Sequence, residues 1–169
     1  MAYSSPTIAL TASRTVVRMR LRCTSLLPCS AERLADELSR SALLNHISWP
    51  MLVFVGLDPD PLPERFAAGR YLTLLLIGGR LSLGEHTLDL QDDPAPDPGL
   101  VWHDAGYSPL IKVWDHKIRL ADFHGMTRYT DEVEVRAGPL TIAAWLFASA
   151  FYRHRQRRLS RLVATGFAY

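Results

Sequence analysis

Hydrophobic and polar residues alternate strictly near the start of the chain. Val17, Met19, Leu21 and Cys23 alternate with Arg18, Arg20, Arg22 and Thr24. A period of two places successive side chains on opposite faces of a strand, so the pattern predicts a β-strand with one face in the core, in a fold that starts at Arg14. Residues 1–13 mix serine, threonine and proline without a period, and we expect them to form a flexible leader.

Two short helices are predicted after this strand. Pro28 ends the strand, and Ser30 is a residue type that caps helix N-termini. An apolar stripe at helical spacing follows it: Ala31, Leu34, Ala35 and Leu38. A second helix is predicted over Ala42 to Ile47. It should stop at Trp49, because the residue before a proline avoids helical backbone angles.

Further strands are predicted from short apolar runs between turn residues. Met51 to Leu57 and Tyr71 to Ile77 are almost wholly apolar and are bounded by a proline-rich loop and by two glycines. Between residues 81 and 90 the apolar positions change from odd to even numbers across Gly84, which predicts a bulge or bend there. The remaining predicted strands are Leu100 to Gly106, Ile111 to Ala121 and Thr127 to Arg136.

A long helix is predicted near the C-terminus. Pro139 suits the first turn of a helix, and no helix breaker follows through Val163. The stretch from Ile142 to Tyr152 is apolar nearly all round, so the pattern does not decide which face is buried. Two faces remain open: Trp145, Leu146 and Ser149, or alternatively Phe147 and Phe151.

These elements indicate a single α+β domain over residues 14–169. Most connections between the predicted strands are too short to hold crossover helices, so we expect antiparallel pairing. The long helix must bury an apolar face, and the concave side of a curved sheet is the one large partner available to it.

The charge distribution changes this picture at one place. The chain has 169 residues and a formal net charge of +2, which disfavours a general nucleic-acid-binding protein. Five arginines nevertheless lie together without an acid: Arg153, Arg155, Arg157, Arg158 and Arg161. A solvated helix end explains such a cluster. The alternative is binding to an anionic membrane or to RNA through the stripe formed by Arg153, Arg157 and Arg161.

The sequence carries no pattern typical of export, membrane insertion or metal binding. The longest weakly polar run, Pro139 to Tyr152, is shorter than the roughly 18 residues of a membrane span, and the N-terminus lacks a basic and apolar signal sequence. Cys23 and Cys29 are too few for a disulfide framework and have no metal-ligand spacing. We therefore expect a cytoplasmic protein without a metal or a cofactor.

The order of elements and several motifs resemble a known family. The motifs are Trp114-Asp115-His116, Gly125-Met126-Thr127 followed by Asp131 and Val133, Gly138-Pro139-Leu140, and Phe151-Tyr152-Arg153-His154. From about Arg14 to Val163 the chain resembles the START-like superfamily, also called SRPBCC, which includes the Bet v 1, polyketide cyclase and lipid-transfer proteins. The resemblance implies a helix-grip fold, in which a curved antiparallel sheet of six or seven strands wraps around the C-terminal helix.

The resemblance also implies a function. It suggests a cavity between sheet and helix that binds or transports a small hydrophobic or amphipathic ligand. A cyclase- or aromatase-like enzyme is one alternative, and a non-enzymatic protein that binds a ribosome, a chaperone or a membrane is another. No residue set matches the catalytic pattern of a particular enzyme branch, so no catalytic residue is predicted.

Strand parity singles out two polar residues of the last hairpin. On one predicted strand Trp114, His116, Ile118 and Leu120 share a face, and on the next Thr127, Tyr129, Asp131, Val133 and Val135 do. A short turn near Phe123 and His124 would place Asp131 opposite His116, or diagonal to it if the turn shifts by one residue. The pair could hold the imidazole positively charged as a ligand anchor or general acid, or it could be purely structural.

Aromatic residues supply the other candidate ligand contacts. Tyr129, Trp114, Trp102 and Tyr71 could form aromatic walls with polar tips, and Trp145 and Ser149 could contribute from the helix. Core packing is the alternative role for all of them. The apolar strands Met51 to Leu57 and Tyr71 to Ile77 offer more apolar surface than one cavity needs, so a homodimer is also predicted.

Overall fold

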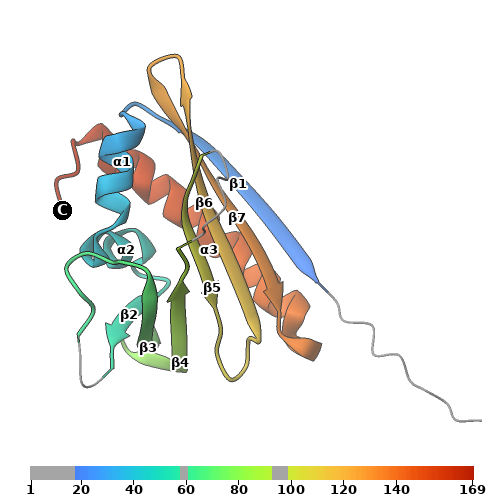
Figure 1. The fold of residues 1–169 in the computed structure, drawn as a ribbon. Helices are drawn as coiled ribbons and strands as arrows, with labels where there is room; N and C mark the ends of the chain where they lie inside the picture. Colours follow the sequence, from blue (N-terminus) through green and yellow to red (C-terminus); the bar gives the residue numbers. More distant parts are fainter. Residues whose placement is uncertain (1–17, 58–60, 93–98) are drawn as a thin grey trace, which may run out of the picture.

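The computed structural model describes residues 18–57, 61–92 and 99–169, which form a seven-stranded antiparallel sheet and three α-helices. The predicted α+β helix-grip fold is confirmed, with the strands in the order β1-β7-β6-β5-β4-β3-β2 (Figure 1). The leader predicted over residues 1–13 lies outside the described residues. The strands are β1 (Met19–Leu27), β2 (Val53–Gly56), β3 (Gly69–Ile77), β4 (Leu81–Leu90), β5 (Leu100–Gly106), β6 (Val113–Phe123) and β7 (Met126–Arg136).

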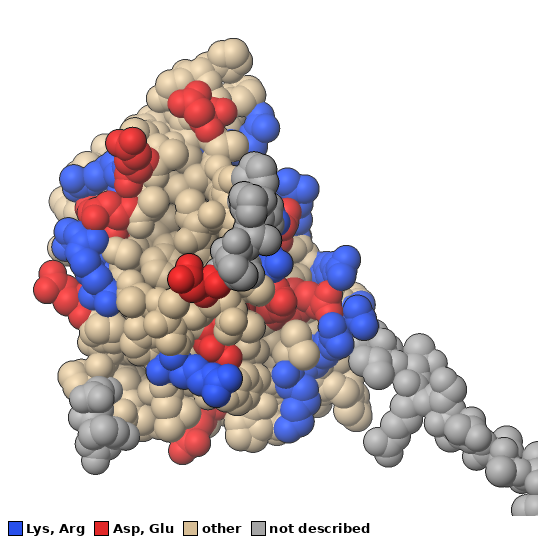
Figure 2. Space-filling model, viewed as in Figure 1, with Lys and Arg blue, Asp and Glu red and all other residues tan. Residues whose placement is uncertain are grey.

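The alternation that predicted the first strand is visible in its burial. In β1 the odd-numbered residues face the interior, and the even-numbered ones are exposed. On the outer face Arg20 pairs with Glu134 of β7 at 2.9 Å, and Arg22 lies 3.6 Å from Glu132. Acidic and basic side chains are intermixed on the face seen in Figure 2, without one large patch of a single sign.

The hairpin of β6 and β7 turns one residue later than expected. Phe123 pairs with Met126, so His124 and Gly125 form the turn, and both have the positive φ angles that such two-residue turns require. His116 therefore lies opposite Val133 and Asp131 opposite Ile118. This is one of the two registers in which the histidine and the carboxylate are diagonal neighbours rather than directly opposed.

The parity change in β4 has the predicted cause. The pairing of β3 with β4 shifts between Leu75, which lies opposite Gly84, and Leu76, which lies opposite Ser82. Gly84 has a φ angle of +94°, so the extra residue of the bulge is accommodated beside a glycine. By contrast, β2 is shorter than the apolar run that predicted it, because Met51 and Leu52 belong to the turn that follows the second helix.

The two short helices form as predicted. Helix α1 (Ala31–Leu38) is capped by Ser30, whose hydroxyl accepts a hydrogen bond from the backbone N–H of Arg33 at 3.2 Å. Helix α2 (Ser41–Ser48) ends before Trp49, whose extended backbone precedes Pro50. Both helices lie at the end of the sheet where the C-terminal helix finishes (Figure 1).

Helix α3 (Thr141–Ala164) crosses the concave face of the sheet and follows a 3₁₀ turn at Gly138–Leu140. Of the two faces left open by the sequence, the one with Phe147 and Phe151 faces the cavity side, whereas Leu146 is 57% exposed. Trp145 instead donates from Nε1 to the carbonyl of Arg20 at the β1 side of the helix. None of the helices in the described ranges combines enough length and apolarity to cross a membrane.

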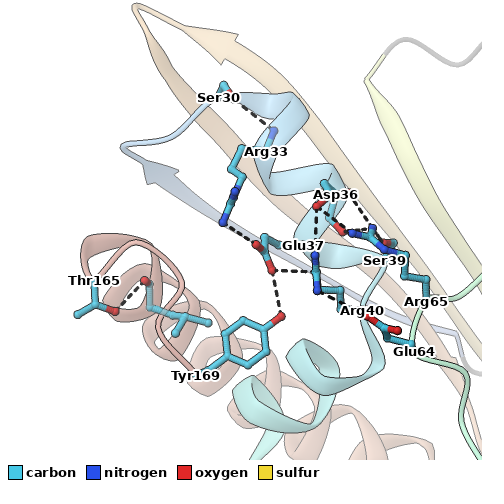
Figure 3. A network of polar contacts seen from close by, with 11 residues as sticks. Ser30, Arg33, Asp36, Glu37, Ser39, Arg40, Glu64, Arg65, Thr165 and Tyr169 are labelled. Atoms are coloured by element: carbon cyan, nitrogen blue, oxygen red, sulfur yellow. Dashed lines mark hydrogen bonds and ion pairs between the residues drawn. The ribbon is translucent and has the colours of Figure 1, made fainter.

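A polar network joins helix α1 to the end of the chain (Figure 3). The side chain of Glu37 is 6% exposed and accepts a hydrogen bond from the Tyr169 hydroxyl at 3.0 Å. It also pairs with Arg33 at 2.9 Å and lies 3.4 Å from Arg40. One buried carboxylate therefore holds both α1 and the C-terminal segment.

We expect Glu37→Ala to lower the free energy of unfolding by about 1–3 kcal/mol, because it leaves two arginines and a phenol without their shared acceptor. Chemical denaturation of the variant measures the loss. Glu64→Ala is the matched control, since Glu64 is 87% exposed and its contact with Arg40 is long, at 4.0 Å. Equal stability of the two variants would contradict the role given to Glu37.

Candidate functional site

A cavity of about 360 Å³ lies between helix α3 and the concave face of the sheet. Apolar side chains from every side make up most of its wall: Leu44, Leu52 and Phe54 near α2 and β2, Leu88 and Ile118 from the sheet, and Ala144 and Phe147 from α3. Ile77, Leu83, Leu110 and Leu140 line it and are also 36 to 62% exposed, so the cavity meets solvent beside them.

Buried polar groups gather at one part of this apolar wall. They come from three neighbouring strands and the helix: His86 of β4, Asp104 of β5, His116 of β6 and Arg155 of α3. Each is less than a tenth exposed. Asp104 lies directly opposite His116 in the register of β5 and β6, so their side chains point to the same face. We call these four residues the polar cluster.

Behind His116, the carboxylate of Asp131 is fully buried and accepts three hydrogen bonds. His116 Nε2 donates to Oδ1 at 2.8 Å, the Tyr129 hydroxyl donates to the same oxygen at 2.7 Å, and Gln156 Nε2 donates to Oδ2 at 2.9 Å. Gln156 in turn accepts from the hydroxyl of Ser25 on β1 at 2.7 Å. The network thus ties α3 to β1, β6 and β7.

The protonation states in this network follow from burial and charge. Burial lowers the pKa of His116 more than the neighbouring carboxylate raises it, so the imidazole is neutral. Burial by itself raises the pKa of Asp131, but the hydrogen bond from His116 and the charge of Arg155 lower it on balance. Burial therefore disfavours the positively charged imidazole that a ligand anchor or general acid would need, and Asp131 is the ionised member of the pair.

Arg155 carries the buried positive charge of the cluster. Its guanidinium carbon lies 5.3 Å from the ring centroid of Tyr152 and 5.7 Å from that of Phe151. Burial by itself lowers the pKa of Arg155, but the acidic groups of Tyr129 and Asp131 outweigh it and raise the pKa, so the side chain stays cationic. The Nε–H group finds no acceptor among the described residues. The solvated-helix interpretation is thus wrong for this arginine.

Asp104 occupies a gap in the sheet. Strands β4 and β5 pair at Leu90 with Asp104 and again at Thr87 with Tyr107. Between these points the backbone N–H of Asp89 donates to the carboxylate Oδ1 of Asp104 at 2.8 Å. Burial raises the pKa of Asp104 to about 7, against the hydrogen bond from Asp89, which lowers it.

Gly106 keeps this gap open for two polar groups. A Cβ atom at this position would lie 3.0 Å from His86 Nε2, 3.1 Å from the Thr87 carbonyl oxygen and 3.2 Å from Asp104 Oδ1, so these neighbours would have to shift by a few tenths of an ångström. Burial lowers the pKa of His86 to about 4, so the imidazole is neutral near pH 7. A neutral imidazole and a carboxyl group that titrates near neutrality therefore lie around one glycine in the cavity wall.

The residues proposed from the sequence fall into three places. Trp102, Trp114 and His116 line the cavity, and Trp114 Nε1 donates to the Tyr152 hydroxyl at 3.0 Å. Tyr129 and Asp131 lie behind His116 in the hydrogen-bond network. The other three lie outside the cavity wall. The Tyr71 hydroxyl donates to the Ala67 carbonyl, and Trp145 Nε1 donates to the Arg20 carbonyl of β1. Ser149 is buried but does not line the cavity.

Sequence reasoning missed three members of the polar cluster. Arg155 lies one helical turn after Phe151 and one before Leu159, so it continues a buried stripe that its charge concealed. Asp104 has the parity of Trp102, and His86 has that of Leu88. Following those apolar residues along each strand would have placed both polar groups on the inner face.

Of the other arginines of α3, Arg158 is half-buried and donates from Nε to the His46 carbonyl at 2.9 Å, and three stay at the surface. Arg153, Arg157 and Arg161 are exposed and lie at helical spacing. Contact of this stripe with an anionic membrane or RNA stays a prediction. Within the described ranges, no group of three histidine, cysteine or acidic side chains is placed to hold a metal ion.

Comparisons with known proteins identify the fold. No family model and no curated protein matches the sequence. Solved structures do match: Ms6760 from Mycobacterium smegmatis is 12% identical, with a TM-score of 0.62 over 87% of this chain and 92% of that one. A START superfamily protein from the same organism is 14% identical, with a TM-score of 0.59 over 86% and 97% of the two chains.

A third similar structure is that of Ara h 8.0201, which is 11% identical with a TM-score of 0.59 over 88% of this chain and 99% of that one. At these low sequence identities the likeness concerns the fold alone. The chain has the helix-grip fold and is similar in that fold to a solved START superfamily structure.

Proposed function

We propose that the protein binds or transports a small hydrophobic or amphipathic molecule in the cavity between α3 and the sheet. The observation that carries this proposal is the largely apolar cavity of about 360 Å³. Its volume falls within the roughly 300–1,000 Å³ typical of small-molecule sites. The likeness to a START superfamily structure supports the same function.

The apolar wall supplies a physical reason for binding. Transfer of apolar surface from water into such a site contributes roughly 25 cal/mol per Å². Trp114 already donates its one N–H group to the Tyr152 hydroxyl, so Trp114 offers a ligand its ring surface, whereas Tyr152 also offers its own O–H group. The polar cluster then provides a small number of oriented groups for one polar end of the ligand.

An enzyme of the cyclase or isomerase type is a second candidate function. It is favoured by Asp104, a buried carboxyl group in the cavity wall whose pKa is raised to about 7 by burial. A general acid or base works best when its pKa lies near the working pH. Turnover of a cavity-bound ketone or polyketide that Asp104→Asn abolishes would support this function over simple binding.

Ala144→Phe tests the cavity. The new ring would project from α3 into the space now lined by Ala144, so we expect affinity for a neutral fluorescent probe such as N-phenyl-1-naphthylamine to fall at least tenfold. Fluorescence titration measures the change. Ala150→Phe is the matched control, because Ala150 is exposed on the same helix and should leave affinity unchanged. Equal affinities of both variants would contradict binding in this cavity.

His116→Ala separates a ligand contact from a structural role. Removal of the imidazole leaves the buried carboxylate of Asp131 with one donor fewer, so we expect the free energy of unfolding to fall by about 1–3 kcal/mol. Loss of probe affinity without loss of melting temperature would instead assign His116 to the ligand. Thermal melting and probe titration on the same variant distinguish the two results.

We also propose a homodimer that buries the outer face of β2 and β3. Val55 and Leu72 lie on this face and are 40% and 45% exposed. We expect light scattering to show a dimer that Leu72→Glu converts to a monomer. Leu26→Glu is the control, since Leu26 is equally exposed on β1 at the opposite edge of the sheet. A monomeric wild-type protein at high concentration would contradict the proposal.

A further inference from the structure

We propose that the ligand is a hydrophobic monocarboxylic acid whose carboxylate binds Arg155 at the polar cluster. This inference rests on the proposed function and names the class of molecule that the cavity takes. Arg155 lines the cavity, is 6% exposed and approaches it from the helix, while the apolar wall continues from Phe147 and Phe151 toward the mouth. A carboxylic acid with a single apolar tail matches this combination of one buried arginine and an apolar wall.

The unpaired donor of Arg155 is the first argument. A buried N–H group without an acceptor is unfavourable, and native proteins contain few of them. The Nε–H of Arg155 is such a group, in a side chain that lines the cavity. Protein atoms enclose Nε itself, so a ligand oxygen satisfies it once the guanidinium turns toward the cavity. Carboxylates suit this position, because a guanidinium binds their two oxygens through paired hydrogen bonds.

The charge balance of the interior is the second argument. Asp131 opposes the charge of Arg155, but its two oxygens already accept three hydrogen bonds from His116, Tyr129 and Gln156. The neutral histidines of the cluster add no further charge. Because Asp131 already balances Arg155, a monoanion leaves one negative charge in excess. A phosphate would add nearly two, which a dry interior disfavours.

Asp104 makes this binding depend on pH. Its carboxyl group borders the same cavity and takes up a proton near neutrality, and the protonated form neither repels the ligand carboxylate nor adds a further negative charge to the site. Binding of an anion should therefore favour protonated Asp104 and be tighter at lower pH. The charged and titratable groups that face Asp104 are Asp89 and His86 of β4, His103 of β5, His116 of β6, and Tyr152 and Arg155 of α3.

The test compares decanoic acid with its methyl ester as competitors of N-phenyl-1-naphthylamine. At pH 6 we expect the acid to bind at least tenfold more tightly than the ester. From pH 6 to pH 8 this preference should fall about tenfold, as one proton is lost near pH 7. In Asp104→Asn the preference should persist at pH 8, since the amide oxygen can still accept from Asp89 and carries no charge.

Variants of Arg155 complete the test. Arg155→Met should abolish the preference for the acid, and Arg155→Lys, which keeps the charge near Asp131, should retain part of it. Arg157→Met is the matched control, because Arg157 is exposed on the same helix. If Arg155→Met does not fold, Arg155→Lys and Asp104→Asn test whether the ligand carboxylate binds at the polar cluster.

The outcomes separate this inference from the proposed function. Equal binding of acid and ester at pH 6, or a preference untouched by the Arg155 variants, overturns the carboxylate inference and leaves a cavity for neutral ligands. A preference that does not change with pH overturns the role of Asp104. Failure of the wild-type protein to bind the neutral probe and both competitors overturns the proposed function itself.

Discussion

A carboxylate that has no contact with water must obtain its hydrogen bonds from the protein, and Asp131 obtains them from β6, β7 and α3. The cost of an uncompensated buried charge makes this arrangement strict, because loss of a donor leaves the carboxylate without an alternative. The charge also requires a cation nearby, which explains how Arg155 is held inside the fold. The polar cluster and the docking of α3 thus follow from one buried group.

The cavity follows from the same geometry. Helix α3 is held against β1 by Trp145 and Gln156 and against β6 by Tyr152, so it crosses the sheet at a fixed position. The small side chains of Ala143 and Ala144 near its start do not fill the space between the helix and the strands. Two core clusters, some of whose members also line the cavity, pack closely around this space and support the fold.

Local rules predicted the elements and the inner faces of the strands from the sequence. Ser30 as a cap, the bulge at Gly84 and the inward set from Trp114 to Val135 each depend on a few neighbouring residues. The register of the last hairpin needed the turn conformation of His124 and Gly125, which parity does not contain. Charge composition could not separate Arg155 from the neighbouring arginines, because only the helix phase decides which arginine is buried.

The pairing of β1 with β7 has a consequence for how the chain folds. The first strand lies against the last, so its register is completed only after more than a hundred intervening residues have been made. Closing so long a loop costs conformational entropy before the stabilising contacts between the two strands can form. Non-local strand pairing of this kind therefore slows folding. During synthesis on the ribosome, β1 keeps its apolar face unpaired until β7 emerges, and the growing chain is exposed to aggregation for that interval.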